Sequence, residues 1–235
     1  MHRLVALTIS IASAGTALAA RPACNSSSGI TVPTVVELYT SEGCNSCPRA
    51  DQWLGSLKGQ PNVVSLAFHV DYWDRLGWTD RFADAAYSRR QHEVSQRAGT
   101  GFVYTPQVVV DGADYRQWPG LPRNAPRPAT VQLNLSRDGN TYVAQVVRGP
   151  GAPPRLAAYW VVTEDGHVSH VKAGENSGVT LHHDSVVRDY RAVPSVGEAP
   201  LRFEPKAIVE SSGARHVQLV LIDAATGKPV QAVGC

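Results

Sequence analysis

Residues 34–117 alternate between short β-rich runs and stretches of helical periodicity. The run at 34–40 is rich in β-branched and aromatic residues and ends in a Ser-Glu-Gly turn, which predicts a buried strand. Apolar residues then recur at the spacing of one helix face, with Pro48 in the first turn. A second strand at 63–70 and a second helix at about 79–98 follow. This order predicts a parallel sheet covered by helices.

The third strand of this region ends in a strong turn signal. The run at 107–110 meets Asp111-Gly112, so 113–117 is expected to return beside it as a hairpin. Four prolines then fall between 119 and 128, which predicts a linker or wrapping segment at 119–129.

The second half, 130–235, consists of short β-rich runs separated by turn signals such as Asp138-Gly139 and Asp165-Gly166. It is expected to form an antiparallel sheet or a small sandwich. The expected strands are 130–135, 142–148, 156–163, 167–171 and 217–222.

The first twenty residues have the pattern of a secretory signal, with a short basic start, an apolar stretch at 4–11 and the cleavage site Ala17-Leu18-Ala19. The apolar stretch is well below the roughly 20 residues that span a bilayer. We therefore expect a signal peptide at 1–20, an N-terminal arm at 21–33, and a secreted or periplasmic mature chain without a membrane span. The full sequence has 22 basic and 20 acidic residues, which indicates protein or small-molecule partners rather than nucleic acid.

Export changes the interpretation of the four cysteines, because thiols outside the cytosol become disulfides. Cys44 and Cys47 are close enough in sequence to be expected as one pair. Cys24 and Cys235 remain, and we expect a structural disulfide between them, with free or intermolecular thiols as the alternative.

The Cys44-Asn45-Ser46-Cys47 motif lies between a predicted strand and a predicted helix, with Asn45 or Ser46 as the expected cap. Backbone amides and the dipole at a helix start stabilise a thiolate. Cys44 is therefore expected to be the exposed, attacking sulfur. Cys47 is expected to resolve the mixed disulfide that Cys44 forms with a substrate.

Thr105-Pro106 directly precedes the third strand. It resembles the cis proline of the thioredoxin fold, which lies against the Cys-x-x-Cys motif while the residue before it pairs with substrate backbone. An ordinary trans proline is the alternative. Thr105 and Pro106, together with the aromatic residues Tyr104 and Trp73, are thus the candidate substrate-binding residues.

The loop after the second strand leaves the same sheet edge as Cys44, where open α/β sheets bind ligands. His69 and Asp71 are therefore candidates for proton transfer or for tuning the Cys44 pKa, and Glu42 is a lesser one. The alternatives are that the polar groups cap the next helix, that Trp78 packs in the core, and that Glu42 is merely solvated.

Four runs carry a resemblance to a known family. They are VELYTSEGCNSCPRAD, AFHVDYWDRLGW, VYTPQVVVDG and GENSGVTLHHDSVVRDY, and they are similar to the secreted bacterial family known as domain of unknown function 1223. The resemblance implies a thioredoxin-like βαβαββ domain at 34–118, but no established reaction. Such proteins have a further helix after the Asp-Gly hairpin, where this chain has its prolines.

The last of these runs contains 174–178 and His182-His183-Asp184. Adjacent strand residues point to opposite faces, which argues against both histidines binding one metal ion. A structural or interface role is expected, with metal binding as the alternative.

Three functions remain as hypotheses, and we assign no cofactor or metal ligand. The first is a thiol-disulfide oxidoreductase that acts on exported proteins with thiols or disulfides, or on a redox partner protein. The second is a copper or zinc chaperone that uses the two thiolates and His69. The third is a redox-inert envelope protein with a structural Cys44–Cys47 disulfide.

Overall fold

The computed structural model of the chain describes residues 24–123, 125–208 and 213–235. The expected signal peptide at 1–20 lies outside the described residues. In the described part, no helix is both long and apolar enough to cross a membrane.

The first region contains the expected strands and helices. They are β2 (Thr34–Thr40), α1 (Pro48–Gly55), β3 (Val63–His69), α2 (Ala85–Arg97), β4 (Gln107–Val110) and β5 (Ala113–Asp114). The 3-10 helix η1 (Asp74–Leu76), in the segment after β3 that was expected to be a loop, is additional. The second helix starts six residues later than expected, because the extended Asp84 caps it by accepting a hydrogen bond from the amide of Ala86. The hairpin strand β5 is shorter than expected. Among the described residues, no helix follows it before β6.

The second region is almost entirely strand, preceded in the chain by a short strand before β2. These strands are β1 (Asn25–Ser27), β6 (Val131–Asp138), β7 (Thr141–Arg148), β8 (Leu156–Glu164), β9 (His167–His170), β10 (Thr180–His183), β11 (Val186–Val193), β12 (Leu201–Phe203), β13 (Arg215–Asp223) and β14 (Pro229–Gly234). Five of them, β1, β10, β11, β12 and β14, were not expected from the pattern.

One sheet of eight strands runs through both regions, in the order β14-β13-β8-β11-β3-β2-β4-β5. β2 and β3 are parallel, as predicted, and β4 is antiparallel to β2. The regions join where β11 lies parallel to β3, with Val186 opposite Ala67. The chain is thus a mixed α/β protein whose β-rich half extends the sheet of its first half.

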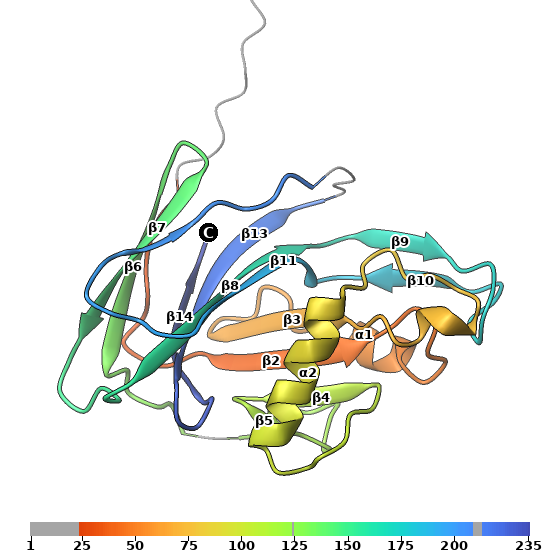
Figure 1. Cartoon of the computed structure of the whole chain (residues 1–235), viewed down its shortest axis with the longest axis horizontal. Helices are drawn as coiled ribbons and strands as arrows, with labels where there is room; N and C mark the ends of the chain where they lie inside the picture. Colours follow the sequence, from red (N-terminus) through yellow and green to blue (C-terminus); the bar gives the residue numbers. More distant parts are fainter. Residues whose placement is uncertain (1–23, 124, 209–212) are drawn as a thin grey trace, which may run out of the picture.

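The two faces of this sheet are covered differently (Figure 1). On one face, Tyr87 and Val94 of α2 pack against apolar residues of β2, β3 and β8. On the other face, Ala50, Leu54 and neighbouring residues of α1 cover β2 and β4. Successive side chains of a strand point to opposite faces of the sheet, so a continuous apolar strand contributes to the core on both sides.

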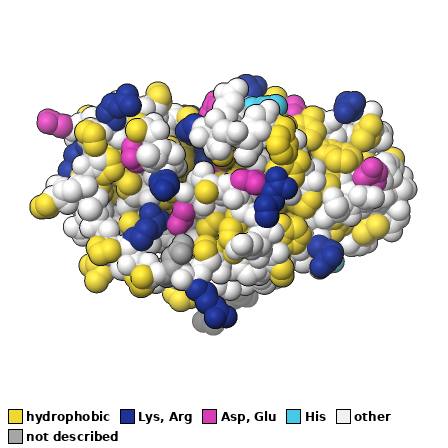
Figure 2. Space-filling model, turned by 90° about the horizontal axis from the view of Figure 1, so that it is seen from below, with side chains coloured by type: hydrophobic (Ala, Val, Ile, Leu, Met, Phe, Trp, Pro, Cys, Tyr) yellow, Lys and Arg dark blue, Asp and Glu magenta, His cyan; other side chains and the backbone are white. Residues whose placement is uncertain are grey.

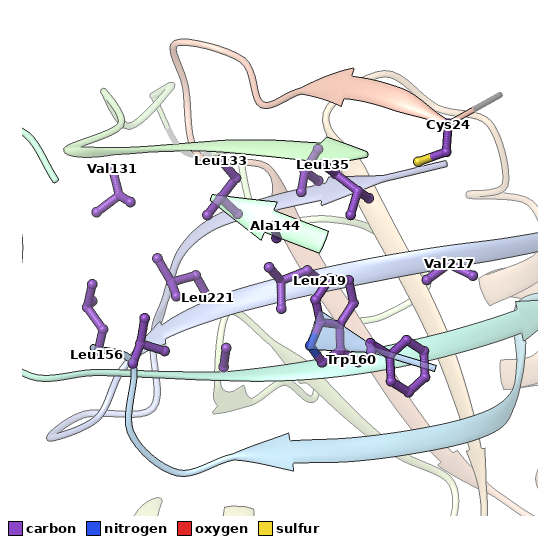
Figure 3. Close-up of a cluster of buried hydrophobic side chains, with 14 of the residues drawn as sticks. Cys24, Val131, Leu133, Leu135, Ala144, Leu156, Trp160, Val217, Leu219 and Leu221 are labelled. Atoms are coloured by element: carbon purple, nitrogen blue, oxygen red, sulfur yellow. The ribbon is translucent and has the colours of Figure 1, made fainter. Parts of the chain in front are cut away.

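A second sheet, β1-β6-β7-β12, packs on the end of the large sheet away from the helices, so that this part is the predicted sandwich. Leu133 and Leu135 of β6 meet Trp160, Leu219 and other buried residues (Figure 3). Burying such side chains contributes roughly 1.5 to 3 kcal/mol each.

The expected Cys24–Cys235 disulfide is present in this sandwich. Cys24 precedes β1 on the smaller sheet, while Cys235 pairs through its backbone with Val217 of β13 on the larger sheet. The disulfide therefore links the two layers covalently. On the outer surface, acidic and basic side chains are interspersed on the face shown in Figure 2.

Candidate functional site

The cysteine motif forms a tight turn between β2 and α1. Cys44 and Cys47 are joined by a disulfide, with Cα atoms 5.5 Å apart. Cys47, rather than Asn45 or Ser46, is the N-cap residue of α1, and no side chain caps the helix. The Cys47 carbonyl accepts from the amides of Ala50 and Asp51, so the motif leads directly into the first turn.

Both sulfur-bearing side chains are buried, which corrects the expectation of an exposed Cys44. Cys44 is 1% exposed and Cys47 is 0% exposed. The β9–β10 loop at residues 171–179, which we call the covering loop, is hydrogen-bonded to this turn. Asn176 Nδ2 donates to the carbonyls of Glu42 (2.8 Å) and Cys44 (3.0 Å). The amide of Asn45 donates to Glu175 of the same loop.

The Thr105-Pro106 bond is cis, as predicted. Trp73 connects this bond to the cysteine turn. Its Nε1 donates to Thr105 Oγ1 at 2.8 Å. A Cβ atom on Gly43 would lie only 3.2 Å from Trp73 Cβ, so glycine allows the indole to approach the turn closely. The structure therefore brings Trp73, Thr105 and the cysteine turn together.

Two other predicted site residues are directed elsewhere. The Tyr104 hydroxyl donates to Asp114 of β5, and the Arg116 guanidinium lies 3.9 Å from its ring centre. Burial, together with the Asp114 carboxylate, raises the pKa of Tyr104. Asp71 accepts from the Ser88 hydroxyl within α2, while the residue that caps this helix is Asp84.

A buried group of acidic and imidazole side chains lies beneath the cysteine turn. Its members are Glu42 after β2, Asp51 in α1, His69 at the end of β3, Asp80 before α2 and His183 in β10. We call these five residues the His-carboxylate cluster. Their exposed fractions range from 0% for Glu42 and His69 to 7% for Asp51. The expectation that Glu42 is merely solvated is therefore wrong.

The cluster is held by a few short contacts. His69 Nδ1 lies 2.7 Å from Asp80 Oδ2, which also accepts from the amide of Glu42 at 2.9 Å. Asp51 accepts from the Thr40 hydroxyl at 2.8 Å. The His69 and His183 rings lie edge to face with centres 5.1 Å apart.

His183 is held less tightly, between two carboxylates. Its Nε2 is 3.4 Å from Glu42 Oε1, and its Nδ1 is 3.9 Å from Asp51 Oδ1. Neither nitrogen makes a hydrogen bond of ordinary geometry in the described structure. Glu42 is anchored from its other oxygen, which accepts from Trp78 Nε1 at 2.7 Å.

The burial and the neighbours of these groups shift their pKa values in opposite directions. Burial lowers the pKa of His183, but Asp51 and Glu42 outweigh it and raise that pKa to about 9. Burial raises the pKa of Glu42, but His183, Ser169 and Trp78 outweigh it, and the net pKa is lowered. The pKa of Asp80 is also lowered, because His69 offsets the effect of burial.

Residues 35–222 match the family described as "Protein of unknown function (DUF1223)". The chain belongs to this family. No curated protein matches this DUF1223 chain significantly.

Two solved structures share the fold of this DUF1223 protein. Protein AGR_C_4864 from Agrobacterium tumefaciens is 24% identical, with a TM-score of 0.62, and the match covers 87% of this chain and 94% of that one. HBP35 of Porphyromonas gingivalis is 14% identical, with a TM-score of 0.60, and the match covers 88% of this chain and 76% of that one. At these identities the likeness concerns the fold alone.

Sequence reasoning named Glu42, His69 and His183 separately in this DUF1223 protein, but it missed Asp51 and Asp80 and did not bring the five residues together. Asp51 gave one usable signal, because it lies between the buried residues Ala50 and Trp53 on the helix and four residues after Cys47. The opposite orientation of the adjacent histidines was predicted correctly, since His182 is exposed and His183 is buried. Asp80 and Asn176 reach the site through tertiary contacts that no local pattern encodes.

Proposed function

We propose that this protein is an exported thiol-disulfide oxidoreductase that uses Cys44 and Cys47 on the thiols or disulfides of other proteins. The observation that carries the proposal is the Cys44–Cys47 disulfide at the start of α1, connected through Trp73 to the cis Thr105-Pro106 bond. A cysteine pair at a helix start is the setting in which a thiolate is stabilised.

The arrangement around the motif supports a thioredoxin-like unit at 34–118. The strand order β3-β2-β4-β5, the helices on opposite faces of the sheet and the cis proline before β4 all agree with this interpretation. Two disulfides and the signal-like segment at 1–20 favour an oxidising compartment outside the cytosol.

In the reducing direction, the Cys44 thiolate attacks one sulfur of a substrate disulfide and the other substrate sulfur leaves as a thiolate. The Cys47 thiolate then attacks Cys44 Sγ, which releases the second substrate sulfur and forms the Cys44–Cys47 disulfide. Two electrons pass to the substrate. Starting from the disulfide seen here, the same steps in reverse oxidise a substrate dithiol.

The covering loop has to move for this chemistry, because both sulfurs are buried beneath it. Opening it breaks the two hydrogen bonds from Asn176 to the turn and the one from the Asn45 amide to Glu175. Each is worth about 1 kcal/mol net, so these bonds together hold the loop by about 3 kcal/mol. The run 174–178 thus acts as a lid over the cysteine pair.

A trapping experiment tests the proposal. The Cys47→Ser variant, mixed with a peptide disulfide, is expected to accumulate a mixed disulfide on Cys44 that mass spectrometry can locate. Cys44→Ser is the matched control and is expected to trap far less. Equal trapping by both variants, or none by either together with no reduction of insulin by the wild type, would count against the proposal.

The complete burial of the two sulfurs favours one alternative, a structural Cys44–Cys47 disulfide in a redox-inert protein. The reduction potential distinguishes the two functions. A value below about −300 mV places the pair beyond ordinary thiol donors, whereas a value near those of known oxidoreductases supports exchange.

A further inference from the structure

The His-carboxylate cluster contains polar atoms that the fold leaves without hydrogen-bond partners. They include Glu42 Oε1, His69 Nε2 and both ring nitrogens of His183. Leaving a buried polar atom without a hydrogen bond costs about 1 to 3 kcal/mol. Several such atoms in one place indicate that something else interacts with them.

The protonation of His69 is set by Asp80. A carboxylate only accepts, so the proton is on Nδ1, and in the neutral imidazole Nε2 carries a lone pair. A histidine held by a carboxylate on one nitrogen, with the other nitrogen available, is the usual arrangement of a metal-binding histidine. Asp80 thus orients His69 as such a partner would.

The charge of the cluster also favours a cation. Glu42, Asp51 and Asp80 are buried carboxylates, and in the described structure their ion pairs involve only His69 and His183. Glu164, another fully buried carboxylate, pairs with His167 and also with two arginines, Arg188 and Arg215. Buried carboxylates are stable when paired or when they coordinate a metal ion.

The ligand atoms are close enough to share one ion. One atom each from Asp51, His69 and His183 lies within 4.8 Å of the others. Ligands of Zn²⁺ lie about 2.0 to 2.2 Å from the ion, so the three atoms have to move closer together around it. Glu42 Oε1 faces His183 Nε2 at 3.4 Å, whereas Asp51 Oδ1 faces Nδ1, so Glu42 holds the His183 ring from the opposite side.

We propose that the His-carboxylate cluster binds one divalent transition-metal ion of the Zn²⁺ type through Asp51, His69 and His183, with Asp80 orienting His69 and Glu42 orienting His183. Two imidazoles with carboxylates suit Zn²⁺ better than Mg²⁺ or Ca²⁺, which prefer all-oxygen sites. The site is distinct from the thiolates of Cys44 and Cys47, and it does not depend on their redox activity.

The test uses the full chain with both disulfides intact, unfolded and refolded with Zn²⁺ and then dialysed. Metal analysis is expected to find one Zn²⁺ ion per chain. With Co²⁺ in its place, the absorption spectrum is expected to show four-coordinate nitrogen and oxygen ligands without a thiolate charge-transfer band. A chain that retains no Zn²⁺, or a Co²⁺ spectrum without the bands of a four-coordinate site, overturns the proposal.

Variants locate the site. His183→Gln is expected to lose Zn²⁺, and Asp80→Asn to weaken its affinity by about 10- to 100-fold. His182→Gln, at the exposed neighbouring position, is the matched control and is expected to bind as the wild type does. The Cys44→Ser/Cys47→Ser double variant is also expected to keep the ion. Equal binding by the two histidine variants, or loss of the ion in the cysteine variant, refutes the assignment. The wild-type Co²⁺ spectrum still decides the question if His183→Gln does not fold.

Discussion

Glu37 and Glu42 are five residues apart in one segment of chain, and both are buried, but their surroundings differ. Both oxygens of Glu37 are engaged, by Arg90 of α2 and by the hydroxyls of Tyr39 and Tyr159. Glu42 accepts from Trp78 on one oxygen, while the other has no hydrogen bond and faces His183.

Glu37 is thus a buried charge that stabilises the fold, whereas Glu42 is a buried charge that belongs to the candidate site. Arg90 stacks on Tyr159, 4.0 Å from the ring centre, and ties α2 to the sheet through Glu37. The Glu42 side has imidazoles where the Glu37 side has a guanidinium. An imidazole can gain or lose a proton or bind a metal ion, whereas a guanidinium stays protonated.

The largest effect is expected from Arg90→Met, which leaves Glu37 buried without its cation. Breaking a buried ion pair costs about 3 to 5 kcal/mol, to be measured as the free energy of unfolding in urea. The double variant Glu37→Leu/Arg90→Met is the control and should recover much of this loss. If the single and the double variant are equally destabilised, the Glu37–Arg90 ion pair does not account for the stability that Arg90 contributes.

The second largest effect is expected from acid, which should lower the stability that Glu37 contributes. Burial raises the pKa of Glu37, but Arg90 and the hydrogen bonds outweigh it, and the net pKa lies below the ordinary 4.5. Its ionised form therefore stabilises the fold above pH 4.5, and this contribution is lost as the pH falls through the lowered value. The unfolding free energy of the wild type should thus decline more steeply in acid than that of Glu37→Gln. Parallel curves would refute this pH dependence.

On the Glu42 side, Asn176→Ala should loosen the covering loop. Removing two hydrogen bonds, worth about 2 kcal/mol together, should speed reduction of Cys44–Cys47 by dithiothreitol roughly 5- to 30-fold. Ser177→Ala, in the same loop but directed to the Lys172 carbonyl, is the control and should leave the rate unchanged. A rate unaffected by Asn176→Ala would mean that the loop does not limit access.

The smallest effect is expected from Glu42→Gln in the metal-free protein. The amide keeps an acceptor for Trp78 and removes repulsion from Asp80, which offsets part of the lost attraction to His183, so stability should fall by only about 1 kcal/mol. The melting temperature of the metal-free variant measures this change in stability. The increase in melting temperature on adding Zn²⁺ should be smaller for the variant than for the wild type. If Glu42→Gln lowers the stability as much as Arg90→Met does, Glu42 is a structural charge like Glu37.

The features predicted correctly from the sequence are those that depend on residues close together in the chain or on a recognisable motif. The strands β2, β3 and β4 and the helix α1 follow from periodicity, whereas the cis bond at Pro106 was expected from its resemblance to the proline of the thioredoxin fold. The start of α2 was misplaced, because 79–84 has helix-compatible residues but Asp80 binds the Glu42 amide instead.

The features that were missed depend on contacts between distant segments. β11 joins the two halves of the chain by lying parallel to β3. Its run VVRDYRAV mixes charged with apolar residues, because the start of the strand is buried whereas the part near its end is exposed. The His-carboxylate cluster draws its five residues from five separate segments, so no spacing in the sequence points to it. The burial of Cys44 likewise depends on a loop more than 130 residues away, since Asn176 is 132 positions from Cys44.

The order of synthesis gives the Cys24–Cys235 disulfide a further consequence. Its partners are 211 residues apart, so Cys24 waits as a free thiol until nearly all of the intervening chain has been made. Cys44 and Cys47, three positions apart, can pair as soon as their segment meets an oxidant. Early closure of that short turn removes the two competitors for Cys24. The cysteine turn thereby protects the correct pairing of the rest of the molecule during its maturation.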